Sequence, residues 1–177
     1  SRDALPVTSD NVEAALLVLE DMIVSVAEEY REKLAPAIDR VWAEGIAMIA
    51  RDLRGWLRRT TEEEGAWIPR YFELSFGLPL ASDRDPRSRR EEVLIDGRFQ
   101  LRGAVDLIEE HRQTGALRVT DHKTGKDRTK DSLVIGGGET MHPILYSLAI
   151  EQVMTDKGVA EARLFFCTSG GGASASI

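Results

Sequence analysis

The sequence predicts a mixed α/β fold, in which helices cover a sheet of antiparallel and parallel strands. Long segments with an apolar stripe fill the first 65 residues, and short alternating segments follow them. A helical segment over residues 139–158 then separates the last strand, residues 162–168, from the earlier ones, as in a crossover to a parallel neighbour. The order helix, helix, three antiparallel strands, helix, strand therefore predicts a mixed sheet with helices on its faces.

Length and composition indicate one folded domain with a sizeable core. The chain has 177 residues, of which 42% are hydrophobic. No apolar run approaches the roughly 20 residues that cross a bilayer, and the N-terminus lacks the features of a secretory signal. We expect a cytoplasmic domain without a membrane partner, cut from a larger protein, with a helical part at 1–65 and an α/β core at 70–168.

The net charge of −7 gives no general support for nucleic-acid binding. Basic residues do cluster locally, although such clusters are usually solvated faces. The best candidate for phosphate contacts is the cluster Lys123, Lys126, Arg128 and Lys130. Cys167 is the only cysteine, which excludes an internal disulfide and an all-cysteine zinc or iron–sulfur site within this chain.

Residues 10–65 are predicted to form two packing helices. The first has apolar residues at spacings of three and four: Val12, Leu16, Leu19, Ile23, Val26 and Tyr30. The second helix begins near Pro36, whose fixed φ suits a first helical turn. Its apolar stripe is Trp42, Ile46, Ile49, Leu53, Trp56 and Leu57. Core packing is favoured over base stacking for both tryptophans, and a surface position is favoured over an active-site role for Glu44.

Alternating residues over 71–77 predict the first strand. Phe72, Leu74 and Phe76 are expected on one side, and Glu73 on the other with Tyr71 and Ser75. A polar loop over 81–91 is followed by a short strand over 93–95 and a hairpin-type turn at Asp96-Gly97.

Residues 101–126, LRGAVDLIEEHRQTGALRVTDHKTGK, then predict a hairpin with strands near 98–108 and 115–122. With the turn near residues 112–113, Asp106 falls within about two positions of the residue opposite Asp121. A slip of one residue would place the two carboxylates on different faces, so the register stays open at this point.

In the favourable register, the two carboxylates share a face with Lys123. A divalent cation relieves the repulsion between two such carboxylates, and oxygen ligands suit Mg²⁺ or Mn²⁺. The backbone carbonyl of His122 could supply a further oxygen, and Glu73 could hold a second metal or its water. The alternative is a surface hairpin with ordinary charges. It is less favoured, because Asp121 continues the apolar alternation of the strand, where an unpaired carboxylate is costly.

The strings GAVDLIEE, LRVTDHKTGK and HPILYSLAIE, within about residues 70–168, resemble the RecB-like nucleases of the PD-(D/E)xK superfamily. The nuclease domain of helicase–nuclease proteins of double-strand-break repair is the most similar in these motifs. The resemblance implies a restriction-endonuclease-like fold with a four-stranded mixed sheet flanked by helices. It implies metal binding by Asp106, Asp121 and the His122 carbonyl, a catalytic Lys123, and an acidic position at Glu73.

This resemblance implies a Mg²⁺- or Mn²⁺-dependent DNA exonuclease that works beside a helicase subunit or domain, since the sequence contains no helicase motif. Candidate DNA contacts are Tyr146, His142, Lys126 and Arg128. His142 stands where relatives usually have glutamine, and the histidine of their first motif is missing. Relatives that carry an iron–sulfur cluster have four cysteines, so no cluster is expected here. The alternative function is an inactive member that binds DNA or a partner protein, although such a member would be expected to lose Asp106, Asp121 or Lys123.

Overall fold

The computed structural model describes residues 6–63, 66–126, 141–169 and 175–176. Arg128 and the predicted start of the third helix near residue 139 lie outside these ranges. The elements in chain order are α1 (Val12–Leu34), α2 (Asp39–Thr60), the 3₁₀ turn η2 (Thr61–Glu63), β1 (Trp67–Phe76), β2 (Val93–Ile95), β3 (Phe99–Leu101), β4 (Gly103–His111), β5 (Leu117–Lys123), α3 (His142–Val153), β6 (Val159–Phe166) and β7 (Ala175–Ser176).

The central sheet has the strand order β1-β4-β5-β6-β7. Strands β1, β4 and β5 are antiparallel neighbours, and β6 pairs parallel to β5 after the crossover through α3. The predicted four-stranded mixed sheet flanked by helices is therefore confirmed. The two-residue strand β7 adds a short antiparallel edge that the sequence did not indicate.

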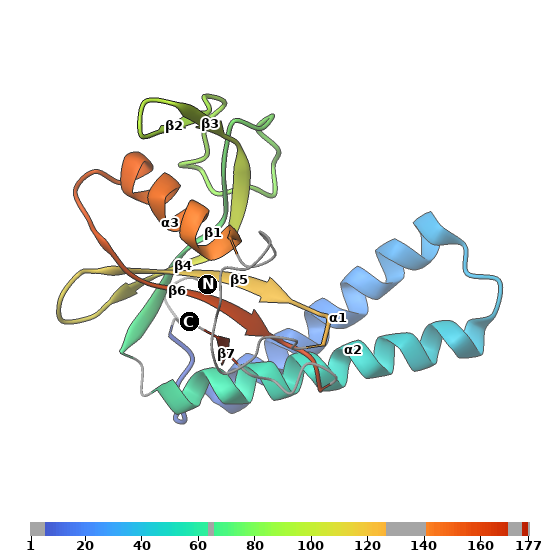
Figure 1. The fold of residues 1–177 in the computed structure, drawn as a ribbon. Coiled ribbons are helices and arrows are strands. Elements are labelled where there is room, and N and C mark those ends of the chain that lie inside the picture. The colour runs from blue at the N-terminus through green and yellow to red at the C-terminus, as the bar shows by residue number, and fades with distance from the viewer. Residues whose placement is uncertain (1–5, 64–65, 127–140, 170–174, 177) are drawn as a thin grey trace.

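Helices cover both faces of this sheet (Figure 1). Helix α3 lies over one face, where its residues Ala149 and Ile150, and Met154 directly after it, pack against apolar side chains of β1, β4 and β5. Helices α1 and α2 form a hairpin on the other side, which projects past the edge of the sheet (Figure 1). Within the described residues, no helix has both the length and the apolar character needed to cross a membrane.

The sheet face beneath α2 carries a buried charged cluster among apolar side chains such as Leu107 and Phe165. The carboxylate of Glu109 accepts hydrogen bonds from Arg118 Nε at 2.7 Å and Nη2 at 2.9 Å, from Thr120 Oγ1 at 3.0 Å and from Arg163 Nη2 at 3.3 Å. The Arg118 guanidinium also stacks over the Trp67 ring, 4.6 Å from its centroid. One carboxylate thus satisfies donors from two further strands, which ties β4, β5 and β6 together.

The expected alternation of β1 is wrong at its midpoint. Glu73 has a φ of +52°, which an L-residue rarely adopts within a strand. As a result, Tyr71 packs with the core on the α3 side, whereas Phe72 lines a small cavity beneath α2. Leu74 and Phe76 then return to the core. The left-handed residue therefore shifts the alternation by one position, and Phe72 does not share a face with Leu74.

The predicted strand over 98–108 is also divided. Its first part is β3, which pairs with β2 in a separate two-stranded sheet, and its second part is β4 of the central sheet. The turn between β2 and β3 has positive φ at both Asp96 and Gly97, which confirms the predicted hairpin turn.

Gly77, just after β1, is a position where alanine should be costly for two reasons. Its φ is +69°, and an added Cβ would lie 2.6 Å from the Cβ of Arg102. We expect Gly77→Ala to lower the free energy of unfolding by about 2–4 kcal/mol, of which about 1–2 kcal/mol is backbone strain. Gly97→Ala is the matched control, since Gly97 has a φ of +67° but open space around it. Equal losses in denaturant unfolding of the two variants would contradict the predicted clash.

Candidate active site

Acidic side chains from β1, β4 and β5 converge with a lysine on the α3 side of the sheet. The pairing of β4 with β5 runs from Glu110↔Leu117 to Leu107↔Thr120. The next position in the same register would place Asp106 opposite Asp121. The observed pairs end one position before the two aspartates, so Asp106 and Asp121 lie just beyond the hydrogen-bonded part of this register, which the sequence could not decide.

Asp106 takes part in the hydrogen bonding of β5 through its side chain. Its Oδ2 accepts a hydrogen bond at 2.7 Å from the backbone N–H of His122. The His122 imidazole Nδ1 is 3.8 Å from the same oxygen. Since His122 lies between Asp121 and Lys123 in the chain, this bond holds the carboxylate of Asp106 close to both residues.

Asp121 and Lys123 follow the buried residues of β5 on the α3 face. Asp121 is 7% exposed, and the Nζ of Lys123 lies 2.5 Å from its Oδ2 as an ion pair. Among the described residues, the ammonium of Lys123 is the one partner found for this buried oxygen. A buried carboxylate in that state is costly unless a cation accompanies it. In this structure, the lysine supplies the positive charge.

Glu73 stands at the kink in β1, within electrostatic range of Asp106. Its Oε2 lies 2.6 Å from Nη1 of Arg84, which comes from the loop after β1. Burial and then the negative charge of Asp106 raise the pKa of the Glu73 carboxyl, while Arg84 opposes the shift. The effect of Asp106 on that pKa indicates that the two carboxylates belong to one electrostatic cluster.

Tyr146 places a phenol from α3 over the aspartates. Burial raises the pKa of Tyr146, and the charges of Asp121 and Asp106 raise it further, whereas Lys123 lowers it. The ring stacks on His142, with centroids 5.7 Å apart and an interplanar angle of 13°. Gly103 makes this position possible, since a Cβ there would lie 3.0 Å from the Tyr146 ring. His142 is exposed at the start of α3.

The remaining predicted DNA contacts are less well placed by the structure. Lys126 is exposed, three residues past Lys123, and no partner is shown for it within the described residues. Arg128 lies outside these residues. Glu44, which is exposed on α2 and pairs with Arg40 at 2.9 Å, is not among the residues that converge here.

Trp56 is a residue next to the site whose role the sequence analysis missed. The His122 side chain faces α2, where its ring meets Trp56 edge-on with centroids 5.8 Å apart, and Phe165 at 6.1 Å. Burial lowers the pKa of His122, so the ring is neutral near pH 7. Trp56 therefore packs behind the residue that joins Asp121 to Lys123. The apolar stripe of α2 indicated that Trp56 packs against the rest of the protein, but it could not identify His122 as its neighbour.

The comparison with protein families agrees with this arrangement. The family model of the PD-(D/E)XK nuclease superfamily matches residues 4–174. The chain belongs to the PD-(D/E)XK nuclease superfamily. Its mixed sheet flanked by helices is consistent with the restriction-endonuclease-like fold of this superfamily. No curated protein matches the chain in a sequence search.

Members of the PD-(D/E)XK superfamily generally use divalent metals such as Mg²⁺, and the residues present can be tested for such a site. Two carboxylates from adjacent strands, one of them buried beside a lysine ammonium, suit a hard cation that takes oxygen ligands. Among the residues that the structure describes, no group of three or more His, Cys, Asp or Glu side chains is placed to bind a metal. Mg²⁺ is usually held by one or two carboxylates and keeps several waters, which matches the two aspartates present.

Proposed function

We propose that this chain is a RecB-like, Mg²⁺- or Mn²⁺-dependent deoxyribonuclease, with its catalytic core in residues 70–168. It hydrolyses phosphodiester bonds as an exonuclease of cytoplasmic DNA repair and works with a helicase partner. The observation that carries the proposal is the hydrogen bond from the His122 N–H to Asp106, which holds that carboxylate next to the Asp121–Lys123 ion pair. Membership of the PD-(D/E)XK superfamily supports it.

Asp106, Asp121 and the carbonyl of His122 are the proposed ligands of the cation. When bound, the cation would lower the pKa of water and offset negative charge on the phosphate. Asp106 is already oriented by the N–H of His122, and a cation at Oδ2 of Asp121 would take the place of the Lys123 ammonium. Cation binding would also relieve the cost of keeping these carboxylates close together.

Lys123 and Glu73 are the other two proposed catalytic side chains. Each is paired with a charged residue in this structure and would leave that partner when the cation binds. Lys123 neutralises Asp121 in this structure. With a cation on Asp121, its ammonium would turn to the phosphoryl oxygens or the attacking water as a point charge. Glu73 would exchange Arg84 for a second cation or a water molecule. His142, Tyr146, Lys126 and Arg128 are the proposed DNA contacts.

Cleavage of linear single- and double-stranded DNA, with and without Mg²⁺ or Mn²⁺, tests this function. We expect metal-dependent loss of substrate with the unmodified chain and a decrease of roughly 10²-fold or more with Lys123→Ala, since a positioned charge at the phosphate is removed. Lys157→Ala is the matched control, because Lys157 pairs with Glu110 at the far end of β4.

The same assay decides between catalysis and binding alone. Absence of metal-dependent cleavage by the unmodified chain, together with retained DNA binding in a gel-shift assay, would support the alternative of an inactive DNA-binding member. Equal activity of Lys123→Ala and the unmodified chain would remove Lys123 from the proposed catalytic residues.

A further inference from the structure

The second half of helix α2 contacts the strand ends that carry the candidate site. Strands β5 and β6 point towards this helix (Figure 1). Asp52 and Trp56 are four residues apart in α2, so their side chains lie on the same face of the helix. Trp56 contacts β5, and Asp52 contacts the segment that follows β6. The helix therefore meets two neighbouring strands of the sheet at the end where Asp121 and Lys123 lie.

The contact of Trp56 with β5 is made through the ring of His122. The two rings meet edge-on, with centroids 5.8 Å apart and an interplanar angle of 80°. The ring of Phe165, from β6, meets the same imidazole edge-on at 6.1 Å. The imidazole is thus packed both from α2 and from the neighbouring strand. Because closely packed side chains leave little room for movement, the backbone of His122 cannot shift without loss of these contacts.

The backbone of His122 takes part in the candidate site at three points. Its N–H donates the hydrogen bond that orients the Asp106 carboxylate, at 2.7 Å. Its carbonyl is one of the proposed ligands of the cation. Its neighbours in the chain are Asp121 and Lys123. A small movement of this backbone would therefore change the separation of the two carboxylates and the position of the lysine together.

Asp52 adds a second contact between α2 and this end of the sheet. Its Oδ1 accepts a hydrogen bond at 3.0 Å from the backbone N–H of Ser169. Two residues earlier in the chain, the N–H of Cys167 donates to the backbone carbonyl of Lys123 at 2.9 Å. The segment that Asp52 holds is therefore the segment that pairs with the end of β5.

We propose that Trp56 is a positioning residue of the cation site, which it orders through the ring of His122, with Asp52 fixing the same face of α2 on the sheet. The inference rests on the proposed function, since it assigns the cation to the aspartates on either side of the His122 N–H. Trp56 contacts neither carboxylate in this role. Residues that orient the ligands of a metal from behind change metal affinity or activity by about 10- to 100-fold when they are replaced.

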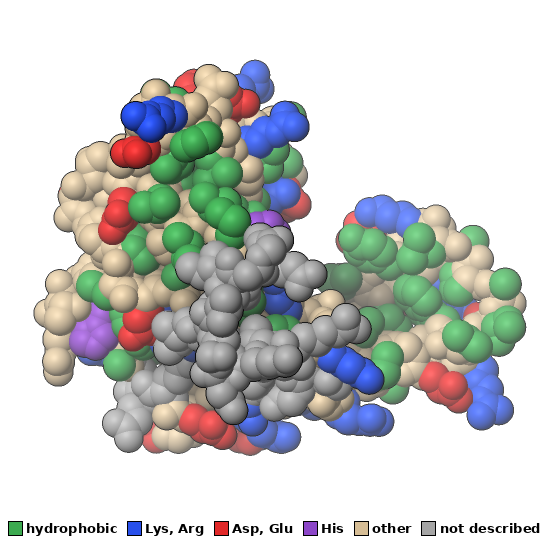
Figure 2. Space-filling model, viewed as in Figure 1, with side chains coloured by type: hydrophobic (Ala, Val, Ile, Leu, Met, Phe, Trp, Pro, Cys, Tyr) green, Lys and Arg blue, Asp and Glu red, His purple; other side chains and the backbone are tan. Residues whose placement is uncertain are grey.

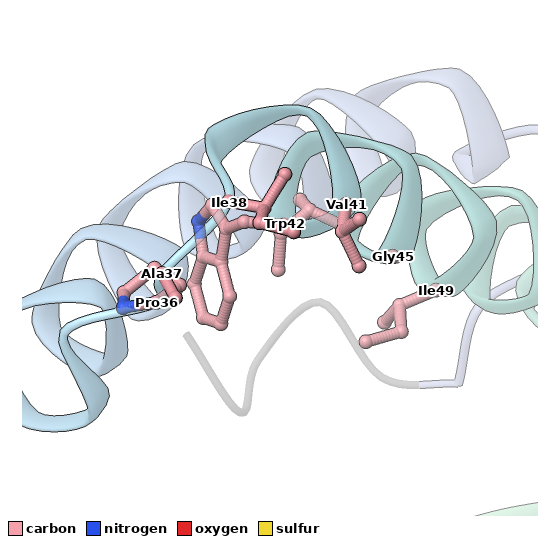
Figure 3. A pocket seen from close by; sticks show the side chains of 8 residues that line it. Pro36, Ala37, Ile38, Val41, Trp42, Gly45 and Ile49 are labelled. Carbon is pink, nitrogen blue, oxygen red and sulfur yellow. The ribbon is translucent and has the colours of Figure 1, made fainter.

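Trp42 provides the matched comparison on the same helix. It precedes Trp56 by about four helical turns, so the two indoles lie on nearly the same face of α2. Figure 3 shows the Trp42 ring beside Pro36 and Ala37. Both hollows that Trp42 lines are formed by residues 20–54. It lies in the projecting part of the hairpin, where hydrophobic side chains are visible at the surface (Figure 2). Its truncation removes helix packing without removing the contact with His122.

Calorimetric titration with Mn²⁺ and single-turnover DNA cleavage by the 177-residue chain test the proposal. We expect Trp56→Ala to bind Mn²⁺ about tenfold more weakly or worse, and to cleave DNA more slowly by a similar factor at unchanged DNA affinity. Trp56→Phe should recover most of both, because a phenyl ring can also meet the imidazole edge-on. Trp42→Ala should keep the Mn²⁺ affinity of the unmodified chain.

A double-mutant cycle with His122→Ala separates positioning from a general loss of stability. His122→Ala removes the ring but keeps the backbone N–H and carbonyl. If Trp56 acts through this ring, Trp56→Ala should weaken Mn²⁺ binding in the unmodified chain and have no further effect in His122→Ala. Hydrogen exchange of the His122 amide needs neither cation nor DNA. It should become faster in Trp56→Ala but not in Trp42→Ala.

Each outcome decides the proposal. Equal Mn²⁺ affinity and equal exchange of the His122 amide in Trp56→Ala and the unmodified chain would overturn it. An equal loss of Mn²⁺ affinity with and without the His122 ring would overturn the route through that ring. If Trp56→Ala does not fold, Trp56→Leu replaces it, with Trp42→Leu as its control. A chain that binds Mn²⁺ without cleaving DNA would contradict the proposed function, whereas the affinities of the Trp56 variants would still decide the positioning role.

Discussion

Asp121→Asn is expected to lower the rate of metal-dependent DNA cleavage by roughly 10³-fold or more. The stabilisation that a bound cation supplies to developing charge is several kcal/mol, and each 1.4 kcal/mol is a factor of ten. Asparagine keeps the shape of the side chain but removes the charge that pairs with Lys123 at 2.5 Å. The uncompensated ammonium would then repel a cation at the same position.

Two measurements check this expectation. Single-turnover cleavage reports the chemical step, and calorimetric titration with Mn²⁺ reports the site without DNA or turnover. Asp96→Asn is the matched control, because Asp96 lies in the β2–β3 turn with a positive φ that asparagine tolerates. Unchanged Mn²⁺ affinity and an unchanged rate in Asp121→Asn would show that Asp121 is not a ligand.

The convergence of Asp121 and Lys123 was predictable because β5 is regular. Leu117, Val119 and Asp121 alternate strictly, so the apolar residues indicated the buried face that the carboxylate shares. The parallel pairing of β6 with β5 was also predictable, since two strands joined by a crossover helix usually lie parallel in the sheet. The fold followed from periodicity and connection rules, which depend on local sequence.

Features that depend on long-range contacts could not be predicted in the same way. Glu73 adopts a left-handed conformation although no glycine or asparagine marks the position, so its strand appeared regular in sequence. The pairing of Glu73 with Arg84 and the contact of Trp56 with His122 join residues that are distant in the chain. A helical stripe indicates that Trp56 is buried, yet it carries no information on which strand covers it.

Glu109→Ala is expected to be the most destabilising single substitution on the α2 side of the sheet. Glu109, Arg118 and Arg163 are all at most 7% exposed, and the single carboxylate accepts hydrogen bonds from both arginines. Removing one partner of a buried ion pair leaves uncompensated charge in the interior, which costs about 3–5 kcal/mol. For a chain of this size we therefore expect a fall in Tm of roughly 6–20 °C.

Glu161→Ala is the matched control for this prediction. Its carboxylate is 3.7 Å from Nη1 of the same Arg118, but its side chain is 35% exposed, so we expect a loss below about 1 kcal/mol. Thermal unfolding of both variants at neutral pH makes the comparison, and similar shifts would contradict a special role for the buried carboxylate. Glu109 lies on the opposite face of the sheet from Asp121. A Glu109→Ala variant that is less stable but still binds Mn²⁺ would therefore show that the charged cluster holds β4, β5 and β6 together and is separate from the cation site.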